Sequence, residues 1–222
     1  MKILPVEKIR EADAFTIENE PIDSVDLMER AASKVYEWFM KRCKTKEVSV
    51  KIFCGIGNNG GDGLALARML YFSGIIPQVF IVRYSDKMSR DCEMNFSRLK
   101  ETEVPMYDIF SEDDFPQIYD NDIVIDAIFG SGLNRPIEGF TAELIKYINK
   151  SNAIKIAIDI PSGLILESHK LGNLETQQLS NSATPIYGAL MEGENIFTKK
   201  IENKNGVIII GSESHGIRED VL

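Results

Sequence analysis

The chain has 222 residues, of which 44% are hydrophobic and 27% are charged, and its formal net charge is −9. This composition is typical of a globular protein with a large core and excludes a mainly disordered chain. The acidic balance gives no support to electrostatic binding of nucleic acid or of an anionic membrane, and its simplest interpretation is solubility.

The first fifteen residues, MKILPVEKIREADAF, lack the uninterrupted apolar segment of a secretory signal, and no apolar run approaches membrane-spanning length. Cys43, Cys54 and Cys92 are odd in number and have no paired spacing, so we expect reduced, structural thiols. Together these features predict a cytoplasmic protein that binds neither membrane nor nucleic acid.

Two helices are predicted first, over residues 5–19 and 23–44. In the second, Leu27, Ala31 and Val35 recur at intervals of four residues and form an apolar stripe. Core packing is the favoured interpretation of this stripe, and an interaction face that mediates a homodimer is the alternative.

The apolar pattern then changes to short runs rich in Ile and Val, which are typical of strands buried on both faces of a parallel sheet. These runs cover residues 50–54, 77–82, 122–128 and 154–160. Helical patterns separate them, over residues 63–73, 88–100 and 139–150. The alternation predicts an α/β fold, a doubly wound sandwich with helices on both faces of a mostly parallel sheet.

Polar or glycine-rich segments follow three of the predicted strands. They are GIGNNGGDG at 55–63, Asp126 followed by GSGLNRP at 130–136, and DIPSG at 159–163. Ligands of open α/β sheets bind at the carboxyl ends of strands, near the switch in strand order. The three segments are therefore candidates for one shared crevice.

The first segment is suited to a phosphate, because glycines allow close backbone approach and the following helix presents free N–H groups. Its Gly55, Gly57 and Gly60 fit the GxGxxG spacing, which alone is a weak signal. Asn58, Asn59 and Asp62 add oxygen ligands and hydrogen-bonding groups that a phosphate cradle does not need. The alternative is a glycine turn before a helix.

Two aspartates, Asp126 and Asp159, lie at or near the ends of apolar strands, where an ionised carboxylate must be paired or bound to a cation. Asn59, Asp126 and Ser162 could together supply hard oxygen ligands to a cation. Asp159 could instead be a general acid or base, and either aspartate could be a helix cap or loop anchor. Arg135 could bind a phosphate or be a surface residue.

The three segments in this order, with LMERAA at 27–32, closely resemble the YjeF N-terminal domain family, whose members are NAD(P)H-hydrate epimerases. The resemblance covers about residues 1–164. It implies a Rossmann-like three-layer α/β/α sandwich. It also implies nicotinamide nucleotide repair, in which the R and S epimers of hydrated NADH and NADPH are interconverted.

The same resemblance implies the residues of the site. A potassium ion would be bound by Asn59, Asp126 and Ser162. The substrate would be bound by Asn58, Asn59, Gly60, Gly61, Asp62, Gly130, Ser131, Gly132, Leu133, Asn134, Arg135, Pro136 and Asp159. The chemistry changes the configuration at C6 of the hydrated nicotinamide ring, and we assign Asp159 as the catalytic acid or base for it.

After Leu164 the sequence departs from this pattern. Residues 165–183 form a polar junction, and residues 184–222 resemble a fragment of the SpoU (TrmH) RNA 2′-O-methyltransferases, carried by TPIYGALMEGENIF and IIIGSESHGI. Ser212 stands where that family usually has asparagine, and the last motif of its methyl-donor pocket is absent. We expect no methyltransferase activity, but an atypical end of the sheet that could impair the epimerase.

Three functions therefore remain. An epimerase is favoured, a non-catalytic domain that binds a nucleotide or a protein is the alternative, and an RNA methyltransferase fragment is the least favoured.

Overall fold

The computed structural model describes residues 6–43, 45–165 and 177–178. Its centre is a five-stranded parallel sheet in the order β3-β2-β1-β4-β5. The strands are β1 (Ser49–Cys54), β2 (Gln78–Val82), β3 (Met106–Ile109), β4 (Asp122–Ala127) and β5 (Ile154–Ala157). The first strand along the chain is central, so the strand order reverses between β1 and β4.

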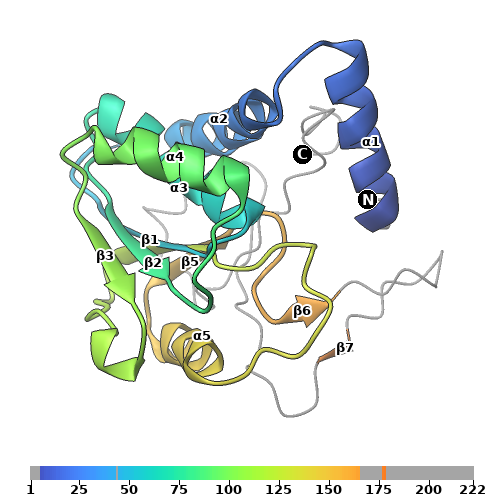
Figure 1. The fold of residues 1–222 in the computed structure, drawn as a ribbon. Coiled ribbons are helices and arrows are strands. Elements are labelled where there is room, and N and C mark those ends of the chain that lie inside the picture. Colours follow the sequence, from blue (N-terminus) through green and yellow to red (C-terminus); the bar gives the residue numbers. More distant parts are fainter. Residues whose placement is uncertain (1–5, 44, 166–176, 179–222) are drawn as a thin grey trace.

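Helices cover both faces of this sheet (Figure 1). The helices of the described chain are α1 (Val6–Asn19), α2 (Ser24–Arg42), α3 (Asn58–Phe72), α4 (Arg90–Lys100) and α5 (Phe140–Lys150), with a short 3₁₀ helix, η1 (Glu112–Asp114). Of these, α1 lies to one side of the layers and covers neither face. The helices α2, α3 and α4 lie on one face and α5 lies on the other. Right-handed crossovers that run in opposite directions from the centre place their helices on opposite faces, so the predicted three-layer α/β/α fold is confirmed.

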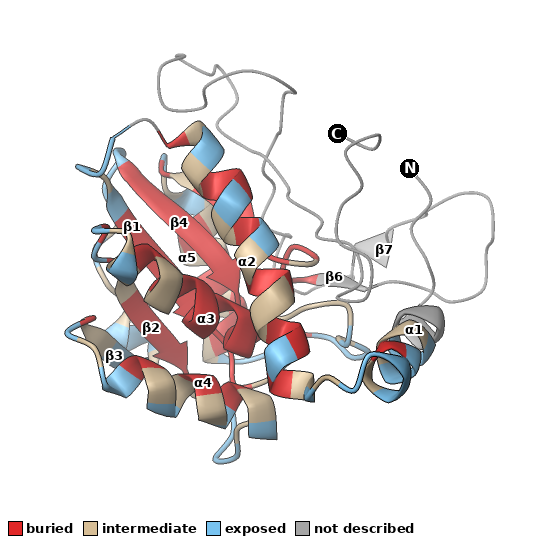
Figure 2. Cartoon of the chain, turned by 90° about the horizontal axis from the view of Figure 1, so that it is seen from above, coloured by how far each residue is buried: buried red, intermediate tan, exposed pale blue. Residues whose placement is uncertain are grey.

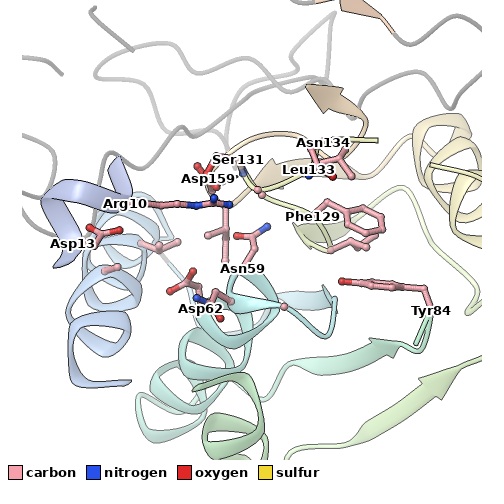
Figure 3. A pocket seen from close by; sticks show the side chains of 18 of the residues that line it. Arg10, Asp13, Asn59, Asp62, Tyr84, Phe129, Ser131, Leu133, Asn134 and Asp159 are labelled. Atoms are coloured by element: carbon pink, nitrogen blue, oxygen red, sulfur yellow. Dashed lines mark hydrogen bonds between the residues drawn. The ribbon is translucent and has the colours of Figure 1, made fainter. Parts of the chain in front are cut away.

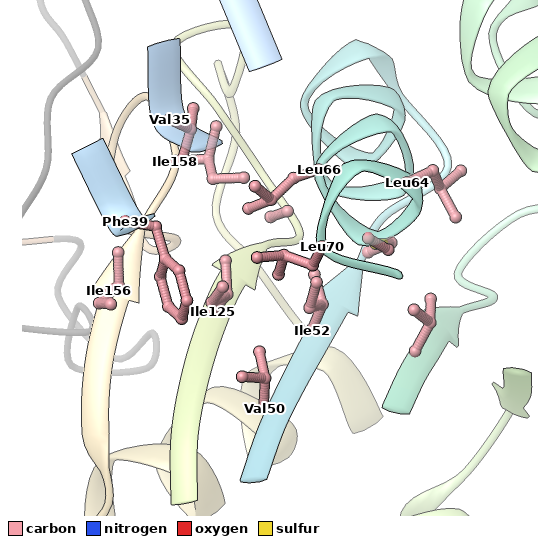
Figure 4. Packing of buried hydrophobic residues seen from close by; sticks show 14 of the residues in the cluster. Val35, Phe39, Val50, Ile52, Leu64, Leu66, Leu70, Ile125, Ile156 and Ile158 are labelled. Atoms are coloured by element: carbon pink, nitrogen blue, oxygen red, sulfur yellow. The ribbon is translucent and has the colours of Figure 1, made fainter. Parts of the chain in front are cut away.

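The apolar runs form strands because the sheet is buried on both sides (Figure 2). All six residues of β4 and five of the six in β1 are buried. One core lies between the sheet and α2, α3 and α4, where Phe39, Leu66 and Leu70 pack against Ile125 (Figure 4). The second core lies under α5. The predicted stripe of α2 is core packing, since Leu27, Ala31 and Val35 are all buried.

The sequence prediction missed β3 and η1 and misplaced the start of α3. Residues 107 and 108 of β3 are exposed, so this edge strand carries no continuous apolar run. The prediction that the helix after β1 begins at residue 63 is wrong, because it begins at Asn58, directly after Gly57. Glycine has low helix propensity, which concealed the first turn. The last run is a strand only as far as Ala157.

The described chain ends in a small antiparallel pair, β6 (Leu164–Ile165) with β7 (Gln177–Gln178). The fragment at 184–222 lies outside the described residues. The division into segments 1–164, 165–183 and 184–222 therefore stays a prediction. Among the described residues, no helix is long and apolar enough to cross a membrane, and Cys43, Cys54 and Cys92 are free and buried.

Close approach of backbones holds α3 against the carboxyl ends of β1 and β4. Gly55 donates its N–H to the carbonyl oxygen of Ala127 at 2.9 Å. A β-carbon added at Gly60 would lie 1.9 Å from the carbonyl oxygen of Gly55. Only glycine at position 60 allows the first turn of the helix to pack this closely on the strand end.

We expect Gly60→Ala to lower the free energy of unfolding by about 1–3 kcal/mol, because the added methyl group meets a backbone atom that must shift. Urea titration of the purified variant measures this change. Gly132→Ala is the control, since its nearest neighbour would be the flexible end of Arg10 at 3.9 Å. Equal stability of the two variants would contradict the close-packing argument.

Candidate functional site

A cavity of about 460 Å³ lies where the strand order reverses, at the carboxyl ends of β1, β4 and β5 (Figure 3). Its walls include the start of α3 and two residues of α1. They also include residues 128–135, which follow β4, and residues 158–159, which follow β5. The lining residues are Arg10, Asp13, Ala31, Val35, Gly57, Asn58, Asn59, Asp62, Tyr84, Ile128, Phe129, Gly130, Ser131, Gly132, Leu133, Asn134, Arg135, Ile158 and Asp159. The three predicted segments therefore converge on one crevice.

Most of the residues predicted to bind substrate line this cavity. These are Asn58, Asn59, Asp62, Gly130, Ser131, Gly132, Leu133, Asn134, Arg135 and Asp159. Gly60, Gly61 and Pro136 are outside its lining. Gly60 packs on Gly55, and a β-carbon at Gly61 would lie 2.5 Å from the sulfur of Met28. These two glycines thus hold α3 in place against its neighbours.

The carboxylate of Asp126 is completely buried at the end of β4 and accepts three hydrogen bonds. Ser162 donates its hydroxyl to one oxygen at 2.7 Å and its N–H to the other at 2.8 Å, and Ile128 donates its N–H at 3.1 Å. Burial raises the pKa of Asp126 to about 6, although these hydrogen bonds act to lower it. The Ser162 hydroxyl also accepts the N–H of Phe129 at 2.9 Å.

The side-chain amide of Asn59 is buried at the start of α3 without a hydrogen-bond partner among the described residues. Neither its amide nitrogen nor its amide oxygen has a hydrogen-bond partner within the described part of the chain, and the residue is only 9% exposed. An unpaired buried amide costs free energy, so this group is a candidate ligand for a bound cation or substrate. Its amide carbon lies 3.3 Å from the position of a β-carbon added at Gly130, which brings α3 beside the segment after β4.

The carboxylate of Asp159 lies next to the same glycine. One of its oxygens accepts the N–H of Ser131 at 2.5 Å and would lie 2.4 Å from a β-carbon at Gly130. Burial is the main cause that raises the pKa of Asp159, and the Ser131 hydrogen bond opposes it. Its backbone φ is +61°, an uncommon conformation for a residue with a side chain and one that is enriched at functional sites.

Nine lining residues were not among the predicted site residues, and four of these nine, Arg10, Asp13, Tyr84 and Phe129, have charged or aromatic side chains. Tyr84 follows β2, and its ring packs on that of Phe129 with centroids 4.8 Å apart, so the two form an aromatic wall. Burial raises the pKa of Tyr84. Arg10 and Asp13 come from α1. No sequence motif marks these positions, because only the fold brings α1 and the β2 end to this crevice.

The residues expected to hold a cation fit that role. Asp126 and Ser162 are joined by hydrogen bonds, and Asn59 offers an unused amide oxygen beside the same segment. Carboxylate, hydroxyl and amide oxygens are ligands for a hard cation. In the described residues, no three His, Cys, Asp or Glu side chains gather as a transition-metal site requires.

Two alanine variants should separate the unpaired group from the paired one. We expect Asn59→Ala to leave the free energy of unfolding within about 0.5 kcal/mol of the parent, because it removes a buried amide that has no partner to lose. Asp126→Ala should lower it by about 3 kcal/mol, because it leaves the Ser162 and Ile128 donors unpaired. Urea titrations without potassium measure both, and an Asn59 cost as large as that of Asp126 would show that the amide is paired.

Comparison with known proteins identifies the family. The sequence profile described as YjeF-related protein N-terminus matches residues 24–184, which extends past the boundary predicted at 164. A protein of Lentilactobacillus buchneri named NAD(P)H-hydrate epimerase is 36% identical over 89% of this chain and 91% of its own. A protein of Limosilactobacillus reuteri with the same name is 33% identical over 73% of this chain and 74% of its own.

A crystal structure of the yeast protein ynu0 is similar in fold, with a TM-score of 0.66 and 23% sequence identity over 84% of this chain and 78% of its own. The family assignment agrees with the order of the strands and with the cavity at the point where that order reverses. The chain belongs to the family of YjeF-related protein N-terminal domains.

Proposed function

We propose that this chain is an NAD(P)H-hydrate epimerase, an isomerase that interconverts the R and S epimers of hydrated NADH and NADPH. One observation carries the proposal: Asp159 lies at the lining of a cavity that also presents a helix N-terminus and two arginines. The curated relatives that bear this name support it. The same cavity therefore presents groups that can bind the phosphates of a dinucleotide and a group that can act as an acid or base.

The helix terminus and the arginines suit the phosphates of the substrate. Gly57 and Asn58 open α3, whose first N–H groups and dipole favour an anion. Arg135 lies on the segment after β4 and lines the cavity near Tyr84. Tyr84 and Phe129 offer ring faces on which a planar base can stack.

Asp159 is the proposed catalytic acid or base. A raised pKa favours the protonated form, which can donate a proton to the C6 hydroxyl so that it leaves as water. The hydrogen bond from Ser131 holds the carboxylate in one orientation. The same group can accept a proton when a water returns to C6.

Potassium is the proposed cation, held by Asn59, Asp126 and Ser162. A bound cation would supply positive charge that offsets the carboxylate and would satisfy the Asn59 amide oxygen. These three residues come from three parts of the fold: Asn59 from α3, Asp126 from the end of β4 and Ser162 from the segment after β5. A homodimer and a cytoplasmic location stay predictions for this protein.

The first experiment is epimerisation of purified hydrated NADPH in its R form, coupled to a dehydratase that consumes only the S form. We expect turnover by the parent chain and a loss of about 100- to 10,000-fold in kcat for Asp159→Asn, with the Kd for substrate little changed. Asp113→Asn, at an exposed position of η1, is the matched control. Binding without turnover by the parent chain would favour the non-catalytic alternative, and normal turnover by Asp159→Asn would reject its role.

Potassium binding is tested by thermal unfolding. We expect KCl to raise the Tm more than choline chloride at equal ionic strength, since a ligand at 100 times its Kd stabilises the folded state by about 2.7 kcal/mol. Ser162→Ala and Asn59→Ala should lose most of this specific increase. An equal increase in Tm for the parent chain and both variants would show that potassium does not bind at Asn59 and Ser162.

A further inference from the structure

A second carboxylate faces the cavity from the side of α3. Asp62 lines it and is 8% exposed, whereas Asp159 reaches it from the segment after β5. Figure 3 shows that these two carboxylates come from different elements, with the side chains of Arg10 and Asn59 at the same cavity. The cavity is therefore bordered by an acidic group on each of two sides.

The position of Asp62 follows from the geometry of the helix. Asn59 and Asp62 are three residues apart on α3, so their side chains share one face of the helix and are separated by about 5–6 Å between β-carbons. Asn59 and Asp159 both border Gly130. Asp62 therefore lies one helical turn beyond the place where α3 meets Asp159.

Inversion at C6 requires chemistry on both faces of the hydrated ring. The hydroxyl leaves from one face, and a water must add to the other face before the product is the opposite epimer. Displacement by water at a ring carbon with inversion is served by two carboxyl groups, one on each face, with room between them for the water. A single carboxylate can reach only the face on which it lies.

We propose that Asp62 is the second catalytic residue and that it serves the ring face opposite to Asp159. This inference rests on the proposed epimerase function. The two residues exchange roles with direction: the one on the side of the hydroxyl acts as acid, and the other acts as base.

The proton and electron transfers balance. The acid donates a proton to the C6 hydroxyl, the C6–O bond breaks with its electron pair on the departing water, and the N1 lone pair forms a C6=N1 double bond. A water on the other face then bonds to C6 and gives a proton to the second carboxylate, while the C6=N1 pair returns to N1. One carboxyl group has lost a proton and the other has gained one, and exchange with solvent restores the starting state.

Two arginines line the same cavity as these carboxylates and can offset their negative charge. Arg10 extends from α1 toward the cavity, and its guanidinium end lies 3.9 Å from the position of a β-carbon at Gly132. Asp13 of the same helix and Arg135 are the other charged side chains of the lining. Two acidic groups without such a cation would repel each other across a small cavity.

The test separates loss of the hydroxyl from inversion. Each epimer of hydrated NADPH is incubated in H₂¹⁸O with the parent chain, Asp62→Asn, Asp159→Asn or the control Asp113→Asn. Chromatography measures the epimer ratio and mass spectrometry measures ¹⁸O at C6, with a reaction lacking protein as the background.

We expect Asp62→Asn to epimerise at least about 100-fold more slowly than the parent but to exchange oxygen, with retention, in the one epimer whose hydroxyl faces Asp159. Asp159→Asn should exchange oxygen only in the other epimer. A purely structural role of Asp62 cannot produce this selectivity for one epimer.

Three outcomes would overturn the inference: normal epimerisation by Asp62→Asn, loss of exchange from both epimers in a folded Asp62→Asn protein, or loss of exchange from both epimers in Asp159→Asn. The last result decides the question even if Asp62→Asn does not fold. Absence of epimerisation by the parent chain would instead reject the proposed function itself, so the two failures are distinct.

Discussion

The candidate site depends on the hydrogen bonds between Asp126 and Ser162. Asp126 lies at the end of β4 and Ser162 in the segment after β5, and their contact joins these two parts of the chain. The Ser162 hydroxyl also accepts the N–H of Phe129, so it fixes the start of the segment that forms the cavity wall. A buried carboxylate with three donors is costly to leave unpaired, which makes this junction rigid.

The position of the other site residues follows from that junction. Gly130 lies immediately after the fixed segment, and its lack of a side chain leaves space for Asp159 and Asn59 on either side. Asp159 is three residues before Ser162, and its left-handed backbone turns the carboxylate toward Ser131. The α3 side of the crevice is set separately, by the backbone contact of Gly60 with Gly55.

This arrangement explains how one crevice can serve both binding and chemistry. The helix N-terminus, the aromatic wall of Tyr84 and Phe129 and the arginines offer contacts to a phosphorylated nucleotide. The acidic residues and the unpaired amide of Asn59 gather where α3 meets the strand ends. Both sets of groups line the one cavity, so a single ligand can contact them together.

The sequence by itself determined the α/β class, because runs of Ile and Val that barely alternate suit strands buried on both faces. It also determined the three segments at the strand ends, because glycine, asparagine and aspartate directly after such runs are unusual for a core. It did not reveal β3, whose exposed edge residues carry no apolar pattern, or the first turn of α3, which glycines conceal.

The tertiary structure alone decided which of these residues share a cavity and which support it. Gly60 and Gly61 belong to the same motif as Asn59 and Asp62, yet they face the packed side of α3 while the others face the crevice. Arg10, Asp13 and Tyr84 reach the cavity from segments distant in sequence. The physical reason is that residue type and spacing report local backbone geometry, whereas contact between distant segments depends on the strand order and on how closely the backbones pack.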